Sequence, residues 1–140
     1  MSKGRSIKAT ELANKTKITP TPIEPSHVSL SFKYLECEHG KFHFKSKQPD
    51  YFIKLLERFR DVCRLTFLQM HTTHKDSLRC HSHDWIATTE KGGFKMKGQL
   101  ADCLGWQFQI SSNEHGRVHG FFVGQVFFVI WLDPDQSLYE

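Results

Sequence analysis

The residues Arg117 and His119, in the segment GRVHG, are the strongest candidates for chemistry in this sequence. They are two positions apart in a β-prone run, so both lie on one face of a strand. That run is otherwise apolar, and an unpaired charge is costly to bury, so the pair needs partners or an open cleft. A guanidinium stabilises a developing phosphorane and an imidazole transfers protons. These residue types predict RNA cleavage without a metal.

Two further residues near this pair complete the set that such a reaction needs. His115 supplies a second imidazole, and Tyr139 supplies a phenol close to the end of the printed chain. One group must take the proton of the 2′-hydroxyl and another must protonate the leaving oxygen. We therefore expect the catalytic residues to be Arg117, His119, His115 and Tyr139.

The same pair also has a purely structural interpretation. In it, Arg117 forms an ion pair with Asp133 or Glu114, and His119 is a core histidine with satisfied hydrogen bonds. Truncation of one member of a buried ion pair leaves the other uncompensated and lowers stability. Truncation of a catalytic group lowers activity instead.

Cationic side chains elsewhere are candidates for contacts with phosphates. Some lie in the histidine-rich segment of residues 71–95, and others lie on a basic helix face that Glu57 and Asp61 interrupt. Phosphate neutralisation gives affinity that does not depend on sequence. The expected RNA-binding residues are Lys54, Arg58, Arg79, His81 and His83.

Two groups of cysteine and histidine contain the ligand types that zinc prefers. They read Cys37-x-His39-x3-His43, and His71-x2-His74 followed by Cys80-His81-x-His83. Neither spacing matches a finger, ribbon or knuckle, and no GxGxxG or P-loop motif indicates a nucleotide cofactor. We expect no metal and no cofactor, and a zinc-stabilised nucleic-acid-binding module is kept as an alternative.

The C-terminal third predicts the sheet that positions Arg117 and His119. Gly124-Gln125 separates two β-rich runs and fits a two-residue hairpin turn with glycine first. The second run, residues 126–132, is apolar on both faces, which predicts a strand inside the sheet. The hairpin register pairs Val123 with Val126, Phe121 with Phe128, His119 with Ile130, and Arg117 with Leu132.

Earlier segments predict the first strand and the main helix. Residues 28–34 alternate apolar and polar side chains, which is typical of a half-buried strand. Residues 50–70 place apolar side chains at helical spacing, which predicts one long helix with Asp50 as its cap.

The middle of the chain shows weaker patterns. Residues 71–95 indicate a long loop with a short structured piece around Trp85, residues 95–104 a short helix, and residues 106–111 a strand. The order of elements predicts one α+β domain over residues 28–140, with a mostly antiparallel sheet and one long helix packed on it.

Composition and charge limit the class of protein. The chain has 140 residues, of which 39% are hydrophobic and 24% charged, as expected of one globular domain. The formal charge is +4, and residues 1–27 hold five Lys or Arg against two Glu. Such a flexible basic arm suits nucleic acid or an acidic partner protein. Four cysteines without a CxxC motif predict reduced thiols, and the absence of a secretory signal or an apolar span predicts a cytosolic protein without membrane contacts.

The stretch Gly116 to Tyr139 resembles the C-terminal signature of a group of small bacterial and phage proteins. More distantly, the order of elements and the final hairpin resemble toxins of the RelE/YoeB/HigB type. The second resemblance implies a small RelE-like toxin fold, an mRNA endoribonuclease acting at the ribosome, and an antitoxin partner. A different class also fits: a non-enzymatic protein from a phage or defence locus that binds a protein partner through the aromatic hairpin and the arm.

Overall fold

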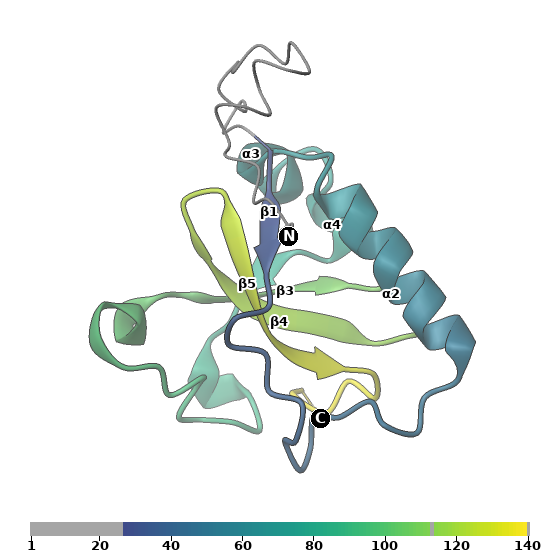
Figure 1. Ribbon diagram of the computed structural model, residues 1–140. Helices are drawn as coiled ribbons and strands as arrows, with labels where there is room; N and C mark the ends of the chain where they lie inside the picture. The colour runs from purple at the N-terminus through teal and green to yellow at the C-terminus, as the bar shows by residue number, and fades with distance from the viewer. Residues whose placement is uncertain (1–26, 113, 140) are drawn as a thin grey trace, which may run out of the picture.

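The structure, a computed structural model, describes residues 27–112 and 114–139. These residues form an α+β fold around one five-stranded mixed sheet (Figure 1). The strands are β1 (Ser29–Ser31), β2 (His81–Ser82), β3 (Gly105–Gln109), β4 (Arg117–Val123) and β5 (Val126–Asp133). The helices are α2 (Pro49–Val62), α3 (Phe67–His71), α4 (Lys75–Leu78) and the 3-10 turns η1 (Trp85–Ala87) and η2 (Gly98–Asp102). Except for His27, the predicted arm lies outside the described residues.

The sheet has the order β1-β5-β4-β3-β2. β5 pairs antiparallel with β4 and parallel with β1, so it lies inside the sheet as predicted. β3 pairs antiparallel with both β4 and β2, which makes the sheet mostly antiparallel. The hairpin turn is confirmed, because Val123 lies opposite Val126. Gly124 in this turn has a φ of 60°, a left-handed conformation that glycine adopts without strain.

The predicted register of the hairpin is wrong beyond Gly120. His119 lies opposite Trp131 rather than Ile130, and Arg117 lies opposite Asp133, one residue further than predicted. A β-bulge separates the two registers, and an extra residue in one strand reverses which face its later side chains occupy. The bulge therefore places Asp133 on the same face as His119.

The residue that bulges is Ile130. Before it, Val129 pairs with Gly120, and the carbonyl of Ile130 accepts a hydrogen bond from the Glu36 N–H at 2.9 Å. Gly120 permits this close approach, since a Cβ there would lie 2.0 Å from the carbonyl oxygen of Phe128. Glu36 thus supplies a hydrogen-bond partner for the carbonyl of the bulged residue, and the missing side chain of Gly120 leaves space for β5.

The prediction of one helix over residues 50–70 is wrong, because the helix ends at Val62 and α3 begins at Phe67. Thr66 and Gln69 form a capping box, which satisfies the first backbone N–H groups of α3. Between the two helices, the Leu65 carbonyl accepts a hydrogen bond from the Val28 N–H at 2.8 Å and takes no part in a helical hydrogen bond. The break lets the segment between the helices contact the start of β1.

Other local predictions differ from the structure in detail. Gln48, rather than Asp50, is the N-cap of α2, and Asp50 lies in its first turn. The predicted loop over residues 71–95 contains α4, β2 and η1, and the predicted helix over residues 95–104 is the 3-10 turn η2. Among the described residues, no helix has both the length and the apolar character that a membrane span requires. The four cysteines are free thiols.

The two faces of the sheet have different surroundings. α2 lies along one side of the sheet (Figure 1) and contributes Tyr51, Leu55, Phe59 and Val62 to a core with Phe108, Val118, Phe127 and Val129. Because side chains alternate along a strand, the neighbours of these residues on β3 and β4 point to the opposite face. That face combines a second apolar cluster, built around Phe42, Phe121 and Trp131, with a group of polar side chains.

Candidate functional site

Four side chains on the face opposite α2 form a continuous hydrogen-bonded row. The Tyr139 hydroxyl lies 2.6 Å from His83 Nδ1, and His83 Nε2 lies 3.0 Å from His119 Nδ1. His119 Nε2 lies 2.9 Å from Asp133 Oδ2. His83, His119 and Asp133 are buried, whereas Tyr139 is 37% exposed. The row therefore connects a buried carboxylate to a phenol that solvent reaches.

The elements of the sheet hold this row in place. His119 and Asp133 come from the paired strands β4 and β5, and the backbone N–H of His83 donates to the Gly105 carbonyl at 2.8 Å. The Asp133 carboxylate also accepts the backbone N–H groups of Ser137 at 2.7 Å and Leu138 at 3.1 Å. These two bonds turn the chain after β5 back toward the sheet. The Asp133 carboxylate thus binds His119 at one end of the row and holds the segment that carries Tyr139, the other end of the row.

Hydrogen bonding and burial determine the protonation of the row. Burial opposes ionisation of Asp133, but hydrogen bonds from His119, Ser137 and Leu138 outweigh it and lower the pKa of this carboxyl group. Full burial lowers the pKa of His119 despite its bond to Asp133. Burial, reinforced by His119 and His81, lowers the pKa of His83 to about 2. Near neutral pH the row therefore holds one carboxylate and two neutral imidazoles.

With these charges, the partners assign one direction to every hydrogen bond in the row. His119 Nε2–H must donate to the Asp133 carboxylate, so His119 Nδ1 is an acceptor. His83 Nε2–H then donates to His119, and His83 Nδ1 accepts the Tyr139 O–H. A proton that enters at Tyr139 can move through His83 to His119, where the adjacent carboxylate stabilises the resulting imidazolium. The row has the connectivity of a proton relay.

The row borders a cleft of about 540 Å³. This volume lies within the range of small-ligand sites, about 300 to 1000 Å³. The cleft is lined by Lys75, Asp76, Arg79, Cys80, His81, Gln107, Arg117, His119, Asp133, Gln136 and Tyr139. The cations Lys75, Arg79 and Arg117 come from α4, from the residue that caps it and from β4, and the exposed end of the row opens among them.

Three long cationic side chains line the cleft, and the described residues provide no carboxylate partner for them. In the part of the chain that the structure describes, none of Lys75, Arg79 and Arg117 lies within 4.0 Å of a carboxylate oxygen. Burial and the nearby charge of Arg79 lower the pKa of Arg117, while Asp133 opposes this effect. Two guanidinium groups held near one another without a paired anion favour an anionic ligand. The structural ion pair considered for Arg117 is therefore not formed among these residues.

Three of the four expected catalytic residues meet at this site, and one does not. Arg117, His119 and Tyr139 line the cleft, whereas His115 lines a separate cavity of about 220 Å³. Its Nε2 lies 3.0 Å from Asp50 and its Nδ1 lies 2.6 Å from Ser111 Oγ. His119 is fully buried and both of its ring nitrogens are hydrogen-bonded, as the structural interpretation of this residue expects.

The expected RNA-binding residues separate in the same way. Arg79 and His81 line the cleft, and His83 belongs to the row. Lys54 and Arg58 lie on α2, which packs on the other face of the sheet. Arg58 Nε donates to the Ile110 carbonyl at 2.9 Å, which ties the helix to the end of β3. Neither residue is among the side chains that line the cleft.

Several residues of the site were not predicted from the sequence. The sequence indicates Asp133 as a partner for Arg117 and as negative charge beside the site, and Lys75 as part of the polar histidine-rich loop, but it gives no role to Gln107. One feature of the sequence could have identified Gln107: it is a polar residue in a strand next to an interior strand. In the structure this side chain is only 4% exposed. A buried amide of this kind needs hydrogen-bond partners.

The two other predicted interaction features have more ordinary surroundings. Among the described residues, no group of three or more His, Cys, Asp or Glu side chains is arranged to hold a metal ion. His71 Nε2 lies 3.6 Å from Cys80 Sγ, and burial raises the pKa of this thiol to about 12. In the aromatic hairpin Phe121 and Phe127 are fully buried, while Val123 at its tip is exposed.

Comparisons of this chain with known proteins found no match: no family model, no curated protein and no solved structure is significantly similar to it.

Proposed function

We propose that this protein is a metal-independent endoribonuclease whose active site is the cleft beside β4. The observation that carries the proposal is the row Tyr139–His83–His119–Asp133, which opens into a cleft where three cations have no carboxylate partner among the described residues. Cleavage of RNA by its own 2′-hydroxyl needs a base, an acid and a stabilised phosphorane. The cleft offers a separate group for each of these roles.

Tyr139 is the group that receives the proton of the 2′-hydroxyl. As the 2′-oxygen forms its bond to phosphorus, its proton passes to the phenol oxygen, and the phenol proton passes to His83 Nδ1. The Nε2 proton of His83 moves at the same time to His119 Nδ1. The charge that results is an imidazolium at His119 beside the Asp133 carboxylate, which offsets much of the penalty of a buried cation.

In this proposal, His81 is the group that protonates the leaving 5′-oxygen. Its ring lies edge-on to that of Tyr139 with the centroids 5.9 Å apart, and both side chains line the cleft. His81 Nδ1 donates to the Ser82 carbonyl at 2.8 Å, which leaves Nε2 directed elsewhere. In the proposed step, His81 Nε2–H transfers its proton to the 5′-oxygen as the phosphorus–oxygen bond breaks. The products are a 2′,3′-cyclic phosphate and a 5′-hydroxyl.

Arg79, Arg117 and Lys75 bind the phosphate between this base and this acid. They come from the αL residue after α4, from β4 and from α4 itself. Hydrogen bonds from a guanidinium to phosphate oxygens are charge-assisted and strengthen as negative charge builds up in the transition state. Asp76 also lines the cleft and adds negative charge at its edge.

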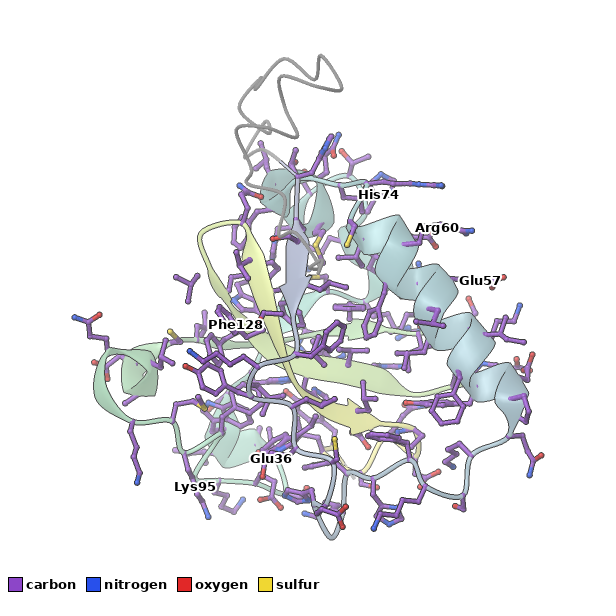
Figure 2. All side chains as sticks on the ribbon, in the orientation of Figure 1. Glu36, Glu57, Arg60, His74, Lys95 and Phe128 are labelled. Carbon is purple, nitrogen blue, oxygen red and sulfur yellow. The ribbon has the colours of Figure 1, made fainter. Side chains whose placement is uncertain are left out.

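The test is cleavage of a labelled single-stranded RNA in the presence of a chelator. Arg117→Ala, His119→Ala and Tyr139→Phe should each lower the rate by about two to four orders of magnitude. Arg60→Ala is the matched control, because Arg60 points outward from α2 (Figure 2) and lies 3.3 Å from Asp61. It should cleave at the wild-type rate. A wild-type protein that neither cleaves RNA nor forms cyclic phosphate ends would refute the proposal.

The order of elements supports a narrower proposal, a toxin of the RelE superfamily type that cleaves mRNA at the ribosome and is held inactive by an antitoxin. A strand is followed by helices and then by antiparallel strands that end in a hairpin. Induced expression of the wild type should arrest bacterial growth, and Tyr139→Phe should not. Arrest that persists in both Tyr139→Phe and Arg117→Ala would separate toxicity from the cleft.

A further inference from the structure

Gln107 presents a hydrogen-bond acceptor in the cleft that has no partner in the part of the chain that the structure describes. It lies on β3 between His81 of β2 and His119 of β4, and it lines the cleft while only 4% exposed. Its Nε2 donates to the Arg79 carbonyl at 3.4 Å, which identifies the other end of the amide as the oxygen. Within residues 27–112 and 114–139, this Oε1 accepts no hydrogen bond.

The chemistry of an amide oxygen limits what can lie against it. A buried acceptor without a partner destabilises the folded chain, and it repels other acceptors. Phosphate oxygens only accept, so a phosphate is held by Arg79 and Arg117 and not by Gln107. The ligand must therefore bring a hydrogen-bond donor to Oε1.

Along an RNA backbone, the 2′-hydroxyl is the donor that lies closest to each phosphate, because the diester and ring oxygens are acceptors. The 2′-hydroxyl is also the group that distinguishes RNA from DNA. The reacting 2′-hydroxyl gives its only proton to Tyr139 in the proposed reaction, so the group that reaches Gln107 belongs to the adjacent nucleotide. We propose that Gln107 selects ribose by accepting a hydrogen bond from this neighbouring 2′-hydroxyl. The inference rests on the proposed function of the cleft.

Gln109 is a matched control two residues further along β3. It is also 4% exposed, its Nε2 donates to the Ser77 carbonyl at 2.6 Å, and its Oε1 likewise has no partner among the described residues. Unlike Gln107, it is not among the side chains that line the cleft. A general effect of replacing a buried glutamine should appear in both variants.

The experiment measures binding separately from cleavage. Fluorescence anisotropy compares RNA with 2′-fluoro RNA of the same mixed sequence, because fluorine keeps an RNA-like sugar but cannot donate. All proteins carry Tyr139→Phe to prevent turnover. The parent should bind RNA about three- to tenfold more tightly than 2′-fluoro RNA, the range for one hydrogen bond. Gln107→Leu should reduce this ratio to about one, and Gln109→Leu should retain it. If Gln107→Leu does not give a folded protein by thermal melting, Gln107→Met replaces it.

Each other outcome has a definite meaning. A ratio of one in the parent, or an unchanged ratio in the Gln107 variant, overturns the inference. If wild type still cleaves RNA in that case, the proposed function stands and only the role of Gln107 fails. A Gln107 effect that follows the base composition of the probe and is equal for both sugars also overturns it, because the donor would then belong to a base. A protein that neither binds nor cleaves RNA refutes the function and the inference together.

Discussion

Acid should unfold this protein through His83, and the effect can be separated from that of other groups. His83 is 4% exposed, and its surroundings lower its pKa from 6.5 to about 2. The unfolded chain takes up a proton at this residue below about pH 6.5, whereas the folded chain does not. The contribution of neutral His83 to stability is therefore complete above that pH and is lost progressively as the pH falls toward 2.

The magnitude follows from this difference in pKa. Each pH unit below the unfolded pKa lowers the free energy of unfolding by about 1.4 kcal/mol for one such group. Between about pH 7 and pH 5, His83 alone should lower stability by about 2 kcal/mol. His119, whose pKa burial also lowers, adds to the effect in the same direction.

Urea unfolding at a series of pH values measures this loss. The wild-type midpoint should fall by about 1 M urea or more between about pH 7 and pH 5. His83→Gln keeps a donor and an acceptor in the row but cannot titrate, so its midpoint should fall by clearly less. The exposed His43→Gln tests the type of substitution and should follow the wild type. The reasoning fails if His83→Gln loses as much stability in acid as the wild type does.

Three further predictions concern the β-bulge, the N-terminal segment and the expectation that the protein binds no metal. Gly120→Ala should lower the free energy of unfolding by at least about 2 kcal/mol, because its Cβ would lie 2.0 Å from the Phe128 carbonyl oxygen. The control is Gly40→Ala, whose Cβ has nothing within 4 Å and which should change this free energy by less than about 0.5 kcal/mol. Chemical denaturation measures both values. Deletion of residues 1–26 should leave the melting temperature nearly unchanged, since their composition offers little apolar surface to bury, and a loss of several degrees would contradict this. Elemental analysis of protein purified without chelator should find well under one zinc per chain, and a stoichiometric amount would favour the zinc-stabilised alternative.

Local signals made part of the fold predictable from the sequence. The hairpin has a glycine at its turn and β-rich runs on both sides, so its signal lies within a few residues. The break between α2 and α3 also has a local signal, because Thr66 and Gln69 have the spacing of a capping box. The helical spacing of apolar residues continues through residues 63–66, however, and this longer pattern favours one continuous helix over the capping box. The bulge has none, since Ile130 resembles its neighbours and its extra position appears only when both strands are aligned.

The sequence predicts a site residue only where a reactive side chain interrupts an otherwise apolar strand. Arg117 and His119 are unusual within an apolar run, so residue type alone identified them. The contact between His83 and Tyr139 joins positions 56 residues apart, and no local pattern relates them. His115 was expected at the site because it is near in sequence, but the positive φ of Gly116 accompanies a turn that leaves it at another cavity. A residue that is close in sequence to a site residue therefore need not lie at the site when a loop separates it from the strand.

The extra residue in β5 also affects how this chain is to be aligned with others. In a chain whose corresponding strand is regular, the carboxylate opposite Arg117 would occupy the position that Leu132 has here. An ungapped alignment would place that carboxylate against leucine and would report the site as lost. A one-residue insertion allowed at Ile130 restores the match, so a search for chains that share this row should permit an insertion at that position.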